Sequence, residues 1–152
     1  MGDIFVTGYE PWQLEDLCAK SEKKKDLKDL GYYHHISFAD HAHAAIDSQT
    51  GEVLAIAGVH MCWPGRYEAF ALLGSKTQGQ FFRIHRLVSK FIKFLDAKRL
   101  ECVVDSDFVE GQRWVKTLGF ELQSLRMDSY LPNGNAAYMY AKFGSGRTRG
   151  GG

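Results

Sequence analysis

The sequence predicts an α+β fold, a mixed and mostly antiparallel twisted sheet with helices on both faces, on the basis of two observations. In the middle of the chain, short apolar runs alternate with glycine-containing turns, a pattern typical of antiparallel strands. From residue 81 the apolar spacing changes from two to about three and a half, which indicates a helix. A helix that links two strands of one sheet forms a right-handed crossover, so those two strands are expected to be parallel.

Length and composition are those of one domain. The chain has 152 residues, of which 45% are hydrophobic, and a chain of this size can bury one core. We expect that domain to cover residues 1–143, and residues 144–152 to form a flexible tail because they offer almost nothing to bury. Nineteen basic and eighteen acidic side chains give a formal charge of +1, so nucleic acid is not an expected partner.

The cysteines and the N-terminus indicate a cytoplasmic protein. Cys18, Cys62 and Cys102 are odd in number and widely spaced, without the Cys-x-x-Cys pair of zinc or redox sites. The N-terminus carries Asp3 and Glu10 and lacks the regions of a signal peptide. No apolar run is long enough to span a bilayer, so we expect no membrane association.

Strand and helix signals alternate along the first half of the chain. Residues 4–9 are a strand candidate, and Pro11 opens a helix that continues to about Cys18. The lysine-rich segment 21–30 is expected to be a solvated helix or a connecting loop, because such charge runs usually face water.

The middle of the chain contains the predicted centre of the sheet. Two apolar runs, 42–47 and 52–60, flank a glycine-containing turn and predict a hairpin. The strand 66–73 follows a Pro-Gly break and is expected to be central, and residues 81–95 predict a core helix. The predicted core face of that helix consists of Phe81, Ile84, Val88, Phe91 and Leu95.

The last third of the chain carries a family resemblance. Residues 101–107 predict a buried strand, the following helix stops at Leu118-Gly119-Phe120, and a closing antiparallel hairpin ends at 137–142. This order resembles the C-terminal half of the GCN5-related N-acetyltransferase (GNAT) fold. The run Val-Leu-Ala-Ile-Ala-Gly-Val at 53–59 resembles the family's second and third strands, where a glycine lets strands approach closely. The resemblance implies an acyl-CoA cofactor and direct transfer of the acyl group to an amine, without a metal.

The chemistry is expected in the loop 74–80, between the central strand and the long helix. A helix N-terminus leaves backbone N–H groups free, and together with the helix dipole they suit an anion such as a pyrophosphate. The resemblance places either Gln78-Gly79-Gln80, or Lys76 with Gly79, at the family's phosphate-binding motif. Phe81 stands where that motif has a second small residue.

An ordinary loop capped by Ser75 or Thr77 is the alternative interpretation of this segment. If the resemblance holds, it also implies that the backbone of Leu72 or Leu73 contacts the acyl carbonyl and the pantetheine arm. Glu68 is then the candidate carboxylate base on the central strand. Its alternative role is that of an exposed strand residue.

Two positions differ from the family pattern. The usual acid, a tyrosine four residues before the glycine of the Gly-Phe ending, is replaced by Val115. The asparagine at the end of the fifth strand is replaced by Asp105-Ser106-Asp107, which makes Ser106 a catalytic candidate and Asp105 a cofactor-binding candidate. Their alternative role is to cap the next helix. Three tyrosines could supply the acid only with a different geometry: Tyr130, Tyr138 and Tyr140.

These departures resemble a branch of small phage proteins, the T7 internal-virion-protein-A-like group, over roughly residues 35–143. That resemblance implies a phage-encoded protein of the host cytoplasm whose partner is a host or virion protein. Three readings of function are therefore retained: an acyl-CoA-dependent N-acyltransferase, a catalytically silent GNAT-like binding protein, and a small RNA-binding domain that is supported only by basic residues on the long helix. The open edge strands of such a sheet are also compatible with a homodimer.

Several other clusters receive a structural interpretation. Four histidines lie close together in the sequence: His34, His35, His41 and His43. They could bind a metal only if a turn brought both pairs together, so a structural role or simple exposure is the preferred interpretation. Cys62 or Cys102 as a nucleophile would need a positioned base, and the sequence names none.

Two surfaces have a functional alternative. A basic stripe on the long helix suits the CoA 3′-phosphate, RNA or only solvent, and it consists of Arg83, Arg86, Lys90 and Lys93. An acceptor cleft beside the loop could be lined by Trp63, Pro64, Tyr67 and Phe70, although aromatic side chains in strands are more often core.

Overall fold

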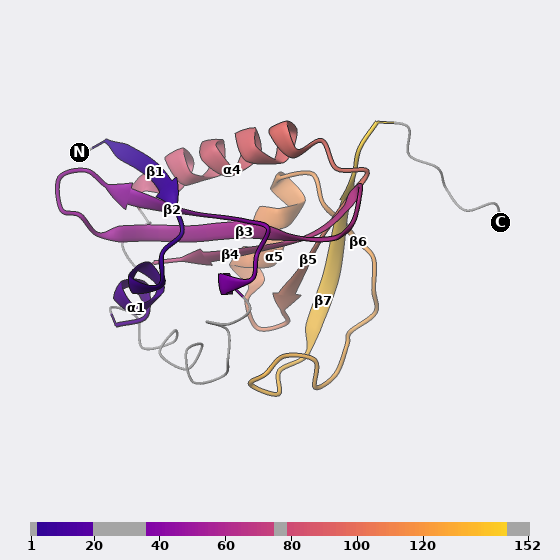
Figure 1. Cartoon of the computed structure of the whole chain (residues 1–152). Helices are drawn as coiled ribbons and strands as arrows, with labels where there is room; N and C mark the ends of the chain where they lie inside the picture. Colours follow the sequence, from indigo (N-terminus) through magenta and orange to yellow (C-terminus); the bar gives the residue numbers. More distant parts are fainter. Residues whose placement is uncertain (1–2, 20–35, 75–78, 146–152) are drawn as a thin grey trace. The chain divides into compact units, whose positions relative to one another are not determined.

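The computed structural model describes residues 3–19, 36–74 and 79–145 (Figure 1). The lysine-rich segment 21–30 lies outside the described residues. The elements are, in chain order, β1 (Ile4–Gly8), α1 (Pro11–Ala19), β2 (His41–Asp47), β3 (Val53–Trp63), β4 (Arg66–Leu73), α4 (Phe81–Leu95), β5 (Arg99–Asp105), α5 (Val109–Thr117), β6 (Glu121–Leu122) and β7 (Ala137–Phe143).

The strands form one mixed sheet in the order β1-β2-β3-β4-β5-β7-β6. β4 and β5 are parallel and are linked through α4, whereas β1 with β2, β2 with β3, and β7 with both β5 and β6 are antiparallel. The predicted α+β class with a mostly antiparallel sheet is confirmed. The strand 66–73 and the helix 81–95 have the predicted bounds, because a Pro-Gly turn and a change of apolar period are local signals.

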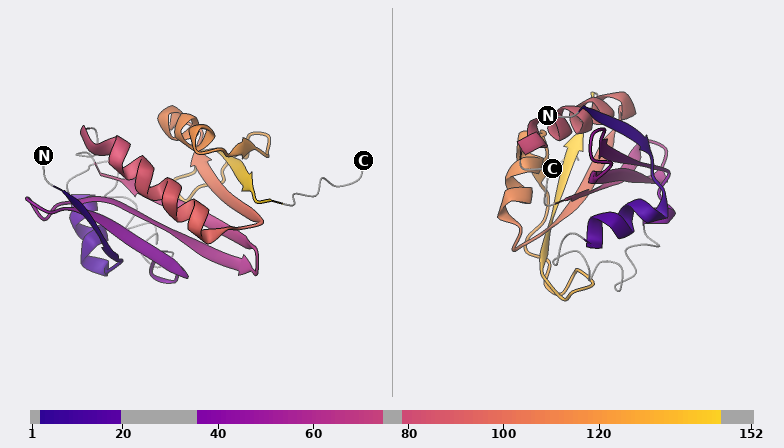
Figure 2. Two further views of the ribbon diagram at one scale, coloured as in Figure 1. Left: turned by 90° about the horizontal axis from the view of Figure 1, so that it is seen from above. Right: turned by 90° about the vertical axis from the view of Figure 1, so that its left-hand side faces the viewer.

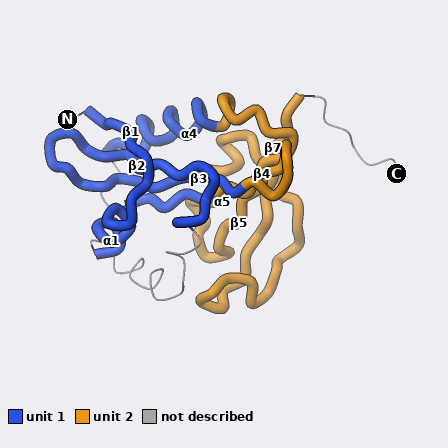
Figure 3. Tube along the Cα trace, in the orientation of Figure 1, with its two compact units in different colours: residues 1–60, 70–91 blue, residues 61–69, 92–152 orange. Residues whose placement is uncertain are grey.

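The chain divides into two compact units (Figure 3). Unit 1 consists of residues 1–60 and 70–91, and unit 2 consists of residues 61–69 and 92–152. The division falls within elements, because β3, β4 and α4 each contribute residues to both units.

In unit 1, α1 and α4 lie on opposite faces of the strands (Figures 1 and 2). Successive strand residues point to opposite faces, so the neighbours Ala44 and Ala45 enter different apolar clusters. The cluster on the α1 side consists of Leu14, Leu17, Cys18, Ile36, Ala44, Ile46, Val53, Ile56 and Leu72. The cluster on the α4 side consists of Ala45, Leu54, Ala55 and Ile84, with Ile4, Leu73 and Val88 packed against it.

The helix α4 buries less than the sequence predicts. Ile84 is its one fully buried residue, and Val88 packs against the same cluster. Phe81 is 38% exposed, and Phe94, which flanks the predicted face, is 86% exposed, so the broad core face predicted for this helix was wrong in extent. The helix packs on unit 1 mainly through Ile84 and Val88, and Phe91 contacts His41 and His43 of β2. Among the described helices, none is both long and apolar enough to cross a membrane.

Gly58 on β3 allows a close approach within unit 1. A Cβ atom at this position would lie 2.2 Å from the backbone oxygen of His41 and 2.8 Å from Cζ of Phe70. Real Cβ atoms do not approach backbone that closely, so only glycine fits. The sequence expectation that this glycine lets neighbouring strands pack tightly is therefore supported.

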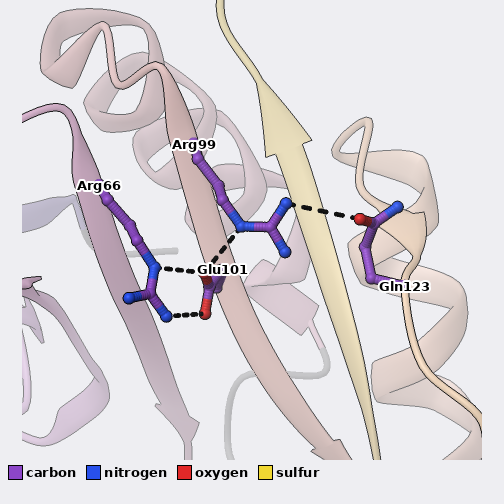
Figure 4. A network of polar contacts seen from close by, with 4 residues as sticks. All are labelled: Arg66, Arg99, Glu101 and Gln123. Atoms are coloured by element: carbon purple, nitrogen blue, oxygen red, sulfur yellow. Dashed lines mark hydrogen bonds and ion pairs between the residues drawn. The ribbon is translucent and has the colours of Figure 1, made fainter. Parts of the chain in front are cut away.

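In unit 2, one buried carboxylate joins β4 to β5 (Figure 4). Glu101, whose side chain is 3% exposed, accepts hydrogen bonds from Arg66 Nε at 2.6 Å and from Arg66 Nη2 at 3.0 Å. Arg99 Nε donates to the same Oε1 atom at 2.7 Å. Arg66 and Arg99 lie opposite each other in the parallel register, so the carboxylate ties together the first residues of both strands.

Each of the two guanidinium groups also lies over an aromatic ring. Arg66 lies over the ring of Trp63 at 4.4 Å, and Arg99 lies over the ring of Phe143 at 5.3 Å. A buried carboxylate is costly to desolvate unless it is paired and hydrogen-bonded. The hydrogen bonds from Arg66, and after them those from Arg99, hold the pKa of Glu101 below its usual range, although burial acts in the opposite direction.

Gly144, the residue after β7, is anchored within unit 2. Gly144 was assigned to the flexible tail, but its N–H donates to the carbonyl of Lys98 at 3.1 Å. A Cβ at Gly144 would lie 2.5 Å from the carbonyl oxygen of Ala97, so this residue is packed against the segment before β5. The rest of the predicted tail from residue 146 lies outside the described residues.

Replacement of Glu101 by Gln is expected to lower the free energy of unfolding by about 2 kcal/mol, because two guanidinium groups then face an amide. The value is at the low end for a buried pair because both arginines stay partly exposed. The pKa of Glu101 is lowered on folding, so its contribution is complete above the unfolded-state pKa and is lost as pH falls through the folded-state pKa. Urea unfolding at neutral pH and below pH 4.5 measures both effects.

The matched control is Asp128→Asn, which removes the exposed ion pair with Arg126 and should change stability little. Equal losses in the two variants, or an unchanged acid dependence in Glu101→Gln, would contradict a special role for the buried carboxylate.

Candidate functional site

The pairing of β4 with β5 ends before β4 does. β4 pairs with β5 over four residues, Arg66–Ala69 opposite Arg99–Cys102, and continues to Leu73. In this second half Ala71 is exposed, Phe70 and Leu73 are partly exposed, and Leu72 is buried.

The side chains of Leu72 and Leu73 have structural roles. Leu72 belongs to the cluster on the α1 side, and Leu73 packs against the cluster on the α4 side. Any contact of these two residues with a ligand therefore falls to their backbone, which is the role that the family resemblance implied for them.

The loop after β4 leads directly to the N-terminus of α4. Gly74 begins it, with its N–H bonded to the carbonyl of Leu54 at 2.7 Å. Gly79 is exposed, and a Cβ there would have nothing within 4 Å. Two of the predicted binding residues, Lys76 and Gln78, lie outside the described residues.

Gln80 is already engaged within unit 1. Its Nε2 donates to Oδ2 of Asp47 at 3.2 Å, which joins the start of α4 to the end of β2. The N–H of Gln49 bonds the Asp47 carboxylate and holds the pKa of Asp47 below its usual range. The predicted ligand role of Gln80 thus competes with an anchoring role, whereas Phe81, the first residue of α4, is 38% exposed.

Glu68 lies in the paired part of β4, opposite Glu101 in the parallel register. It is partly exposed and lies two residues after Arg66, so it shares the face of the buried ion-pair network. Trp63 lies at the end of β3, where its ring carries the guanidinium group of Arg66, and the acceptor cleft beside the loop stays a prediction.

Asp105 and Ser106 close β5 in a network that holds the turn before α5. Asp105 Oδ1 accepts the N–H of Asp107 at 2.9 Å, and Oδ2 accepts Asn135 Nδ2 at 3.0 Å. The N–H of Ser106 donates to the carbonyl of Ala136 at 2.9 Å. The N-cap residue of α5 is Phe108, and no side chain caps this helix. Asp105 and Ser106 therefore do not have the capping role that was their alternative interpretation.

The tyrosine position of the family pattern is filled by a core residue. Val115 on α5 is 8% exposed. Tyr140 is 2% exposed and donates its hydroxyl to Gln112 Oε1 at 3.4 Å, and burial raises the pKa of Tyr140. Its hydroxyl is therefore a poor proton donor. Tyr130, by contrast, is 48% exposed.

Neither a thiol nor a metal is indicated as the reactive group. Burial raises the pKa of Cys102 to about 12, Cys18 is buried, and Cys62 is exposed. No group of three potential metal ligands comes together within the described residues. His41 and His43 instead pack edge-on against Phe91 of α4, and His34 and His35 lie outside the described ranges.

Sequence reasoning missed the residues that support the site. The Arg66, Arg99 and Glu101 network was not predicted, although two charges two residues apart in an apolar strand are a usable signal for a buried pair. Gln112 was missed as well. Its amide donates to the carbonyls of Asp105 and Ser106 at 3.3 and 3.1 Å, and no local pattern indicates this contact.

Comparisons with known proteins bear on the fold. No protein-family model and no curated protein matches the sequence. A spermidine N-acetyltransferase from Vibrio cholerae, in complex with CoA and spermine, is similar with a TM-score of 0.68 and 12% identity, over 93% of this chain and 96% of that one. A ribosomal-protein-S5-alanine acetyltransferase from Vibrio fischeri has a TM-score of 0.68 and 14% identity, over 98% and 97%.

An acetyltransferase of the GNAT family from Streptococcus pneumoniae has a TM-score of 0.64 and 12% identity, over 93% of this chain and 99% of that chain. These likenesses extend over nearly the whole of each chain. The chain therefore has the GNAT fold, as the sequence resemblance predicted.

The cysteines are expected to differ sharply in reactivity. A disulfide reagent such as DTNB should modify one thiol per native chain, Cys62, because Cys18 and Cys102 are buried. At pH 8 a thiol of pKa about 12 has roughly one thiolate in ten thousand molecules. With the variant Cys62→Ser, DTNB should give no rapid increase in absorbance until denaturant is added. Rapid modification of Cys102 in that variant would contradict the burial described for β5.

Proposed function

We propose that this protein binds an acyl-CoA and transfers the acyl group to an amine of a protein or small molecule, as an N-acetyltransferase. One observation carries the proposal. In a sheet with the GNAT fold, the central strand β4 continues past its pairing with β5, and the chain then leads through the open Gly79 to the N-terminus of α4. This is the arrangement that an extended arm ending in phosphates requires.

The proposed binding residues act mainly through the backbone. Leu72 and Leu73 present peptide groups to the pantetheine arm, because their side chains are occupied by the two cores. The N–H groups at Gly79 and at the start of α4 are the proposed phosphate ligands, and Lys76, Gln78, Gln80 and Phe81 are the further proposed binding residues. Gln80 already donates one amide hydrogen to Asp47.

The proposed chemistry needs a base and a proton donor. Acyl-CoA supplies the activated acyl group, and Glu68 accepts the proton of the attacking amine. Ser106 is the proposed donor near the departing thiol, and Asp105 is proposed to orient it through the turn that Asn135 holds. Two of the structural neighbours are a spermidine N-acetyltransferase and a ribosomal-protein-S5-alanine acetyltransferase, so spermidine and an alanine-bearing peptide are the first acceptors to test.

A catalytically silent protein is the second candidate function. The buried Val115 and the buried, hydrogen-bonded Tyr140 favour it, because neither can act as the acid. In this case the fold would serve as a scaffold that binds a host or virion protein, in keeping with the resemblance to the phage group. A phage-encoded protein of this kind would act in the host cytoplasm.

Calorimetric titration with acetyl-CoA and with CoA tests the binding half of the proposal. We expect micromolar affinity, and at least a tenfold loss in Gly79→Leu because the side chain would fill the space where phosphate approaches the backbone. The matched control is Gly8→Leu on β1, which should bind normally. At Gly8, as at Gly79, a Cβ atom would have nothing within 4 Å. Absence of binding at millimolar ligand would contradict the proposal and favour the silent scaffold.

The catalytic half is tested by Glu68→Gln. Release of free CoA in the presence of spermidine or an alanine-terminated peptide should fall by roughly a hundredfold or more, while acetyl-CoA affinity stays unchanged. Glu110→Gln, an exposed carboxylate in the first turn of α5, is the control. Activity that survives in Glu68→Gln would exclude this carboxylate as the base.

A further inference from the structure

β1 leaves one edge of the sheet unprotected. It is the first strand in the sheet order, and its pairing with β2 runs without a bulge. Phe5 is 50% exposed and Val6 is 48% exposed, and as neighbours they point to the two faces of the strand. Charges, prolines and bulges normally protect such edges, and the segment Ile4–Gly8 contains none of them.

The register with β2 identifies the backbone groups at this edge. Tyr9 donates its N–H to the carbonyl of Ala42, and Ser48 donates to the carbonyl of Asp3. Hydrogen-bonded pairs alternate in an antiparallel ladder, so the odd-numbered residues of β1 bond β2. The N–H and C=O groups of Ile4, Val6 and Gly8 therefore point away from β2. Within the described residues, the one hydrogen bond to them comes from the Thr7 hydroxyl to the Gly8 carbonyl, at 3.1 Å.

We propose that β1 pairs antiparallel with β1 of a second copy, across a twofold axis at Val6, so that two sheets become continuous. In this register Val6 bonds Val6 of the partner subunit, and Ile4 bonds Gly8 of the partner subunit. Every outward backbone group of β1 then finds a partner, because the three outward residues are symmetric about Val6.

A second copy fits this edge better than a charged partner would. In the same register Phe5 lies beside Thr7 of the partner subunit, and Asp3 lies opposite Tyr9 of the partner subunit, so like charges do not meet. The position of β1 is also fixed within unit 1, because Ile4 packs against the cluster on the α4 side. The strand at the opposite end of the order, β6, has two residues and offers far less backbone.

The dimer is expected to be weak and dependent on concentration. Five strand residues form a smaller contact than a standard interface. Sedimentation equilibrium over a range from about one micromolar to hundreds of micromolar should show monomer passing into dimer. A monomer throughout that range overturns the proposal, whatever the protein does with acyl-CoA.

The twofold axis gives a sharp test, because residue 6 meets its own copy. Val6→Lys and Val6→Glu should each be monomeric, since two like charges would lie side by side at the axis. An equimolar mixture of the two variants should dimerise at least as well as the native protein. Recovery in the mixture cannot come from misfolding of either variant.

The matched control is Leu125→Lys, which places a charge at a side chain that is 89% exposed and does not belong to β1, and it should leave the native dimer intact. Circular dichroism and thermal unfolding check that all variants stay folded. A Val6→Lys protein that still dimerises, or a mixture of the Lys and Glu variants that stays monomeric, overturns the proposed pairing.

Discussion

The buried carboxylate of Glu101 is the interaction on which the centre of this fold depends. A parallel pair of strands linked by a helix has no tight turn to set its register, so another contact must fix which residues face each other. Arg66 on β4 and Arg99 on β5 both bond this one carboxylate, at 2.6 and 2.7 Å. The bond from Arg66 crosses from β4 to β5 and so fixes the register of the two strands, whereas the bond from Arg99 lies within β5 and helps to neutralise the carboxylate. The pairing extends to Ala69 and Cys102.

The part of β4 beyond its pairing with β5 follows from that constraint. Beyond the paired segment, β4 continues to Leu73 with its side chains committed to the two cores of unit 1. The strand then leads the chain to Gly79 and the N-terminus of α4. A structural network in unit 2 and a proposed binding segment in unit 1 thus share one strand, which accounts for the position of the site in the chain.

The fold could be predicted because its signals are local. Apolar spacing and glycine turns were sufficient to place β4 and α4, and the Leu-Gly-Phe ending gave the helix after β5. The ion-pair network could not be predicted, because it depends on which residue of β5 faces Arg66. For the same reason the sequence did not reveal that Asp47 holds Gln80, that Asn135 holds Asp105, or that α4 buries mainly Ile84.

The measurement that tests the central claim most directly is nuclear magnetic resonance of the backbone amides during titration with CoA, which has no acceptor and needs no turnover. We expect the amides of Leu72, Leu73 and residues 79–82 to shift together and to saturate at one affinity. The amides of β6 and of the Val109–Thr117 helix serve as the internal reference. Shifts confined to other segments, or none at millimolar CoA, would contradict an acyl-CoA site at the end of β4.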